Sequence, residues 1–246
     1  FWIMKAEYTL AGWSPAAMHG FVVGWHLACS LLVGVLAMRL FGRREWATAA
    51  ACLHAIHPAH TATVYWIACQ TELLTTCFLL VGVLAYGRHA GWPRGVLTAH
   101  FDGREAQPAA SPGQAVTPSG VVAVVCYGLA LGCRENAVLF PVVCWLGDRL
   151  LGTARRGRLR WEHAAMGLVL VGYLAVRWQM LGGFALPGKP YLMPITDPGF
   201  GRYLLEKAAI YVSGLFLFVP VVPVGGQVFF TEHPEYLYSL AGAAVA

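Results

Sequence analysis

The stretch AAMHGFVVGWHLACSLLVGVLAM, residues 16–38, decides the fold class of this chain. It contains no acidic or basic residue apart from two histidines, and it is long enough to cross a bilayer core, for which a helix needs about 20 apolar residues. Arginines follow it directly, at Arg39, Arg43 and Arg44. Basic residues collect at the cytoplasmic ends of membrane spans. We therefore expect residues 16–38 to form a transmembrane helix.

The composition of the whole chain agrees with a membrane protein. Of its residues, 58% are hydrophobic and 12% are charged, and the mean hydropathy is +0.59. A soluble domain carries about 25% charged residues, so this chain has too few charges to cover a water-facing surface. The net charge of +5 comes from short basic clusters between apolar runs. These clusters indicate membrane orientation, and we expect no nucleic-acid partner.

Further apolar runs predict about eight membrane segments in total. The others are residues 46–67, 73–86, 120–133, 137–151, 164–181, 204–224 and 236–246. We therefore predict an all-α, polytopic transmembrane helical bundle in which residues 1–246 form a single domain fragment, truncated at both ends. Within it, residues 88–119 read as a flexible cytoplasmic linker, because residues 106–119 are rich in Pro, Ala, Ser and Gly.

The arginine distribution predicts an orientation. Residues 39–44 and 149–160 are basic, and Arg88, Arg94 and Arg104 lie in a third loop. If these loops face the cytoplasm, alternation places the segment before residue 16, the turn near residues 57–72, the tip at Arg134-Glu135 and the loop 182–203 on the noncytoplasmic side. Those regions hold few Lys or Arg, as the positive-inside rule requires.

The tip Arg134-Glu135-Asn136 is the first candidate for chemistry. Its flanking apolar runs are short, so we expect it to lie below the outer membrane surface. A guanidinium at that depth needs an anion, and its planar fork suits phosphate or carboxylate. One interpretation is a phosphate clamp for a lipid-linked substrate. The other is an internal ion pair of Arg134 with Glu135 or Glu72 that holds the helices together.

The motif His57-Pro58-Ala59-His60 is the second candidate. Pro58 breaks or kinks a helix, so both imidazoles should project from an outer turn. They could contact a substrate phosphate or an acceptor, they could be parts of a structural turn, or they could bind a divalent metal with Glu72 as third ligand. Two histidines without a clear third ligand make the metal the minor alternative. Glu72 itself could cap its helix or pair with Arg134.

Two more histidines, His19 and His26, lie in the first span. Their spacing of seven residues places them on the same side of a helix. A histidine inside a membrane helix commonly donates a hydrogen bond to a neighbouring helix, and we assign these two that role.

Several short motifs together resemble a known family. They are His57-Pro58-Ala59-His60-Thr61, Val64-Tyr65-Trp66-Ile67, Glu72-Leu73-Leu74, Cys133-Arg134-Glu135-Asn136-Ala137-Val138 followed by Pro141, and Tyr173-Leu174-Ala175-Val176-Arg177 followed by Gly182-Gly183. Their order resembles membrane glycosyltransferases of the C-type fold, above all the tetratricopeptide-bearing transmembrane O-mannosyltransferases and their bacterial relatives. His19 and His26 match two further histidines of that family. The resemblance covers most of residues 8–211.

The chain also departs from the family pattern. Gln70 stands where the family usually has Arg, and Arg134 stands for Lys. The catalytic acid of such enzymes lies in the first outer loop, which we expect to fall before Phe1. Glu7 is the only carboxylate in the remaining part of that region, and it matches no catalytic motif.

The resemblance implies inverting transfer of a sugar such as mannose from a polyprenyl-phosphate carrier to a protein or glycan hydroxyl on the noncytoplasmic side. An acidic base would deprotonate the acceptor, and cationic groups would stabilise the departing phosphate. The residues implied in substrate and phosphate binding are His57, His60, Glu72, Arg134 and Glu135, with no resident metal. The alternatives are a transporter or flippase for a lipid-linked or anionic solute and a noncatalytic membrane scaffold. A transporter would be favoured by inverted repeats, which the sequence does not show.

Overall fold

The computed structural model describes residues 2–12, 14–102, 116–151, 160–181 and residues 198, 200, 201, 204 and 205. Every regular element in these ranges is a helix. The chain divides into two compact units, Phe1–Ile56 with Thr63–Phe184 and His57–Ala62 with Ala185–Ala246. Most of the predicted outer loop 182–203, nearly all of the apolar run 204–224 and all of the run 236–246 lie outside the described residues.

The first unit begins with α1 (Trp2–Ala11) and the long α2 (Pro15–Phe41), which contains the stretch at residues 16–38. Local signals set both ends of α2. The Ser14 side chain accepts a hydrogen bond from the Ala17 N–H (3.4 Å), and Pro15 fills the first helical turn, where a missing N–H costs nothing. At the other end Gly42 takes the left-handed conformation with φ 68°, which glycine adopts without a Cβ clash.

The apolar run 46–67 is not one helix. It forms α3 (Arg44–Ile56), the 3₁₀ turn η1 (Pro58–His60), α4 (Thr61–Tyr65) and the start of η2 (Ile67–Cys69). The predicted break at His57-Pro58 is confirmed, since α3 ends at Ile56, immediately before the residue that precedes the proline. The next helix is α5 (Gln70–Ala90), which ends at Gly91.

The remaining helices are α6 (Val96–Phe101), α7 (Pro118–Cys133), η3 (Glu135–Leu139), α8 (Phe140–Leu150) and α9 (Trp161–Leu181). The described part of the predicted linker 88–119 is therefore ordered into the last turn of α5, the helix α6 and the start of α7. Residues 103–115 of that linker lie outside the described residues.

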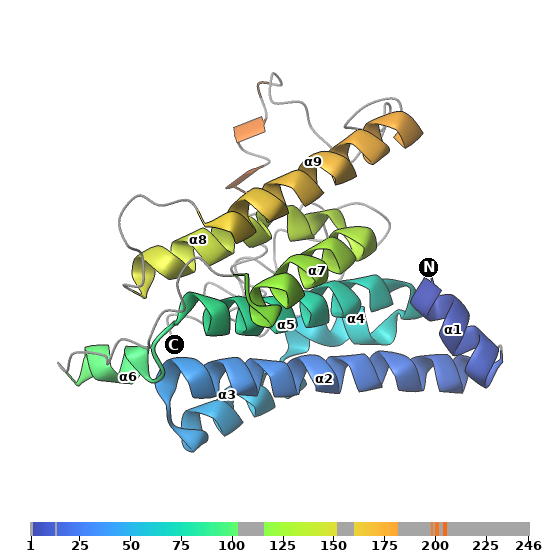
Figure 1. The fold of residues 1–246 in the computed structure, drawn as a ribbon. Coiled ribbons are helices and arrows are strands. Elements are labelled where there is room, and N and C mark those ends of the chain that lie inside the picture. Colours follow the sequence, from blue (N-terminus) through green and yellow to red (C-terminus); the bar gives the residue numbers. More distant parts are fainter. Residues whose placement is uncertain are drawn as a thin grey trace. The chain divides into compact units, whose positions relative to one another are not determined.

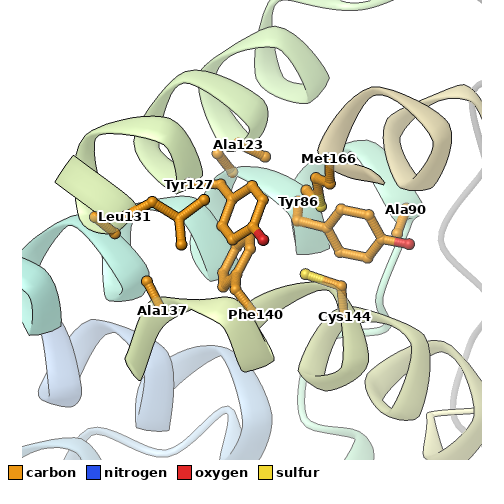
Figure 2. Close-up of a cluster of buried hydrophobic side chains, with 11 residues drawn as sticks. Tyr86, Ala90, Ala123, Tyr127, Leu131, Ala137, Phe140, Cys144 and Met166 are labelled. Atoms are coloured by element: carbon orange, nitrogen blue, oxygen red, sulfur yellow. The ribbon is translucent and has the colours of Figure 1, made fainter. Parts of the chain in front are cut away.

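In the first unit α2 packs on α3 and α5, α5 packs on α7, and α7 packs on α9 (Figure 1). The core lies between α5, α7, α8 and α9, where Figure 2 shows the side chains of Tyr86, Tyr127, Phe140 and Met166 gathered together. The Tyr127 and Phe140 rings stack with centroids 5.6 Å apart. Gly82 permits this approach of α8 to α5, because a Cβ there would lie 2.9 Å from the Phe140 ring.

Two helices in the described part of the chain, α2 and α5, are long and apolar enough to cross a membrane. The apolar α7 is shorter, with 16 residues, or about 24 Å at 1.5 Å per residue. Large apolar side chains are exposed along α2, α7 and α9, at positions that include Leu27, Leu31, Val125, Leu129, Leu168 and Met180. Charged and polar side chains, by contrast, are buried in the same unit at Glu7, Gln70, His89, Asp148 and Glu162.

Candidate functional site

Arg134 lies at the junction of α7 and η3, opposite the start of α5. Its backbone is extended (φ −154°, ψ 145°), so the residue interrupts the helical path between Cys133 and Glu135. Its Nη2 lies 2.6 Å from Oε1 of Glu72, and the two side chains are 40% and 33% exposed. Of the carboxylates considered for an ion pair with Arg134, the structure therefore selects Glu72. The exposed part of the guanidinium retains donor groups for a second anion.

Glu135, the second residue of the predicted tip, faces a different cation. Its Oε2 lies 3.1 Å from Nη1 of Arg177 on α9, which also donates to the Tyr173 hydroxyl (3.1 Å). Because Glu135 is 67% exposed, this pair contributes little to stability. It places the guanidinium of Arg177, on α9, beside η3. The sequence marked Arg177 only as part of a family motif and did not indicate this contact.

Glu7 is the residue that sequence reasoning missed most clearly. Its side chain is 5% exposed. Its carboxylate accepts hydrogen bonds from the Trp25 indole (2.9 Å) and from the Gln70 amide, whose nitrogen lies 2.6 Å from each oxygen. These contacts tie α1 to α2 and α5. Gln70, the departure from the family's usual Arg, is thus a neutral hydrogen-bond donor to a buried carboxylate.

The start of α5 therefore carries two polar contacts. Gln70 is buried against Glu7, and Glu72 reaches Arg134 at the end of α7. Residues two positions apart point in different directions on a helix, which explains how one helical turn serves both partners. The carboxylate of Glu72 also lies in the first turn of α5, where the helix dipole favours negative charge.

His57 and His60 belong to the second unit. The His57 Nδ1 accepts a hydrogen bond from the Ala59 N–H (3.1 Å), and the His57 and His60 rings meet edge-on at 6.0 Å. This geometry stabilises the Pro58 turn. The role in substrate binding that the resemblance implies for both histidines, together with Glu72, Arg134 and Glu135, stays a prediction. Within the described ranges, no three His, Cys, Asp or Glu side chains are grouped as metal ligands require.

The two histidines of α2 contact neighbouring helical segments. His26 Nε2 lies 3.0 Å from the carbonyl oxygen of Ala55, and the His26 ring stacks on His54, both on α3. His19 meets the Tyr65 ring edge-on at 6.3 Å. The interhelical hydrogen bond expected of these histidines is present for His26.

A second buried polar cluster lies at the opposite end of the unit, where α5 and α8 finish and α9 begins. Asp148 accepts hydrogen bonds from the Tyr86 hydroxyl (2.5 Å) and the Trp92 indole (2.8 Å), and His163 lies 3.5 Å from the same hydroxyl.

Glu162 continues this cluster. Fully buried, it contacts the His89 imidazole and the Arg160 guanidinium, the latter at 3.5 Å. The other ring nitrogen of His89 lies 2.6 Å from the Thr117 hydroxyl, which also caps α7. The cluster joins α5, α7 and α9, and a buried carboxylate of this kind is tolerated because it is paired. None of the sequence motifs indicated this cluster.

Comparison of the chain with known proteins gives one partial match. No family model matches the chain, and no solved structure matches it. The protein O-mannosyl-transferase Tmtc1 of Drosophila melanogaster is 32% identical over 151 residues, which are 61% of this chain and 15% of that protein. The chain thus spans a small part of the length of this curated relative. The similarity supports a relationship of the chain to the O-mannosyltransferase family that its motifs resemble.

Proposed function

We propose that this chain is part of a polytopic membrane glycosyltransferase, which transfers a sugar such as mannose from a polyprenyl-phosphate carrier to a protein or glycan hydroxyl on the noncytoplasmic side. The relationship to a protein O-mannosyltransferase supports the reaction class. The single structural observation that carries the proposal is the partly exposed Arg134 guanidinium, held by Glu72 at the end of a short apolar helix.

The distribution of side chains supports a multi-pass arrangement. Apolar side chains cover the outside of α2, α7 and α9 while Glu7, Asp148 and Glu162 are buried. Exposed apolar surface of this extent is unfavourable in water and favourable against lipid. Buried, paired charges are the usual form in which ionisable groups occur inside membrane bundles. Helices other than α2 and α5 therefore complete the bundle in our proposal.

Arg134 is proposed to act on the departing phosphate. Negative charge grows on the bridging oxygen as the glycosidic bond breaks, so a fixed cation stabilises the transition state more than the bound carrier. Glu72 orients the guanidinium through one nitrogen and leaves its other edge for the ligand. Because α7 is about 24 Å long, it is shorter than a bilayer core of about 30 Å. A lipid phosphate could therefore approach Arg134 from the membrane.

Glu7 is not assigned as the base that deprotonates the acceptor. Both of its oxygens accept hydrogen bonds from Gln70, and one also accepts from Trp25. These contacts hold α1 against α2 and α5, so we assign Glu7 a role in positioning α1. The base remains assigned to the first outer loop of the intact protein, as the resemblance implies.

The proposal is tested by sugar transfer in membranes that contain the full-length protein, with labelled mannosyl phosphoryl polyprenol as donor. Arg134→Ala is expected to lower the rate about 10²–10³-fold, the usual effect of losing one such contact. Arg149→Ala removes a cation that lies over the Trp145 ring instead and should leave transfer unchanged.

Unimpaired transfer by Arg134→Ala would remove this residue from the mechanism. Absence of transfer with every polyprenyl donor, combined with solute movement into proteoliposomes, would identify the protein as a transporter and refute the proposed enzymatic function. Absence of both activities would favour a scaffold.

A further inference from the structure

A groove lies between α2 and α5 at the end where both helices finish, away from Arg134. Leu36 and Leu40 of α2 and Val83 and Leu84 of α5 form its apolar wall, and Trp92 closes one side. The groove is shallow, with a free volume of about 10 Å³, and it is partly open to the outside. In the described part of the chain, α2 and α5 are the two helices that are long and apolar enough to span a membrane. The groove between their ends therefore lies where a span meets the headgroup region.

Three arginines gather at this groove. Arg39 lines it directly, and Arg88 and Arg94 directly follow Gly87 and Pro93, which also line it. The position of Arg94 follows from the backbone, because the Gly95 N–H donates to the carbonyl oxygen of Arg39 (2.8 Å) and so binds the loop after α5 to the end of α2. Arg88 lies in the last turn of α5.

These three cations lack a carboxylate partner within the described part of the chain. The ion pairs found there, within 4.0 Å, involve Arg134, Arg160, Arg177 and His89 instead. Like charges this close repel one another, and a bound anion would relieve the repulsion. The apolar wall beside them matches a ligand that carries a hydrocarbon chain next to its anionic group.

We propose that this groove binds an anionic phospholipid, whose phosphate lies between Arg39, Arg88 and Arg94 and whose acyl chain lies along Leu40 and Val83. The arginines match the phosphate of such a ligand, and the apolar wall matches its acyl chain. Basic pockets between membrane helices bind anionic lipid headgroups by this combination of charge and apolar contact. The site is separate from the proposed sugar-transfer site, and it holds whether or not that reaction is confirmed.

The test measures thermal unfolding of the protein in a neutral detergent, with phosphatidylglycerol, phosphatidylcholine or inorganic phosphate added. Phosphatidylglycerol is expected to raise Tm in a saturable manner, and the other two should not. Replacing Arg39, Arg88 and Arg94 by Gln should weaken the apparent lipid affinity roughly fivefold per arginine, or roughly a hundredfold for all three. Native mass spectrometry of retained lipid gives a second readout if the triple variant unfolds early.

Two matched variants sharpen the result. Replacing Arg43, Arg44 and Arg149 by Gln removes the same net charge outside the groove and should retain the lipid response. Leu40→Gln keeps the cations but alters the apolar wall, and it should weaken lipid binding as well.

An equal loss in both triple variants would show a nonspecific charge effect and would overturn the site. An equal Tm rise with inorganic phosphate, or an unchanged lipid response in Leu40→Gln, would show that the groove binds only the anionic group. Either result would refute the proposal that its ligand is a phospholipid. A lipid response that survives the loss of Arg39, Arg88 and Arg94 would also refute the proposal.

Discussion

Gly147→Ala is the substitution whose effect on stability the structure predicts most directly. The Trp92 ring lies directly against Gly147 of α8, and a Cβ built on this glycine would be 2.6 Å from the Trp92 Cη2 and still closer to Cζ2. Ordinary carbon contacts begin near 3.5 Å. Trp92 cannot simply rotate away, because its indole N–H donates to Asp148 at 2.8 Å and its ring also lies against Gly87 on α5.

The expected magnitude combines three effects. Alanine gains about 1 kcal/mol over glycine inside a helix. Overpacking of the Trp92 contact costs about 1–3 kcal/mol, and loss of the indole hydrogen bond to the buried Asp148 carboxylate costs about 1.5–3 kcal/mol. The net loss is therefore about 1.5–5 kcal/mol. Tyr86 retains its own hydrogen bond to Asp148, so this carboxylate is not left without a donor.

Thermal unfolding of the purified protein measures the effect. A loss of 1.5 kcal/mol corresponds to a decrease in Tm of roughly 3–6 °C for a domain of this size, and a larger loss lowers it further. Gly172→Ala on α9 is the control, because nothing lies within 4 Å of its Cβ position. It should leave Tm unchanged or raise it. If Gly147→Ala were as stable as the parent protein, the placement of Trp92 between α5 and α8 would be wrong.

Two further predictions concern the polar contacts at the start of α5. Glu72→Gln and Arg134→Gln, combined in a double-mutant cycle of unfolding free energies, should show a coupling below about 1 kcal/mol, because both side chains are partly exposed; a coupling above about 2 kcal/mol would identify a mainly structural pair. Glu7→Ala should lower the free energy of unfolding by about 2–4 kcal/mol, since it leaves the buried Gln70 amide without its acceptor. Glu45→Ala, at an exposed position of α3, is its control, and equal Tm values for the two variants would contradict the assigned role of Glu7.

Local signals in the sequence predicted part of the helical framework, as the break at Pro58 shows. The Ser14-Pro15 start and the Gly42 end of α2 also act within a few residues, although the prediction for residues 16–38 did not rest on them. Their effect depends on backbone geometry that neighbouring residues share. Hydropathy likewise marked the core of α2 and α5 as candidate spans, because the transfer of side chains into lipid is largely a property of each residue.

The site was only partly predictable. Arg134 and Glu72 were recognised as polar residues beside apolar runs, and their pairing was one of the alternatives. The sequence could not choose between Glu72 and Glu135 as the partner of Arg134. That choice depends on the extended backbone at Arg134, which directs its side chain toward α5 while Glu135 reaches Arg177 on α9.

The sequence by itself determined that this chain is helical and apolar, which of its apolar runs contain the long helices α2 and α5, and which family it resembles. Only the tertiary structure decided which polar groups meet. Glu7 bonds Gln70 across 63 positions, and Tyr86 bonds Asp148 across 62. Such pairs depend on the register in which whole helices pack, and that register follows from side-chain shapes along the full interface. Hydrophobic periodicity shows only which face a helix buries, and it does not specify which residue lies opposite.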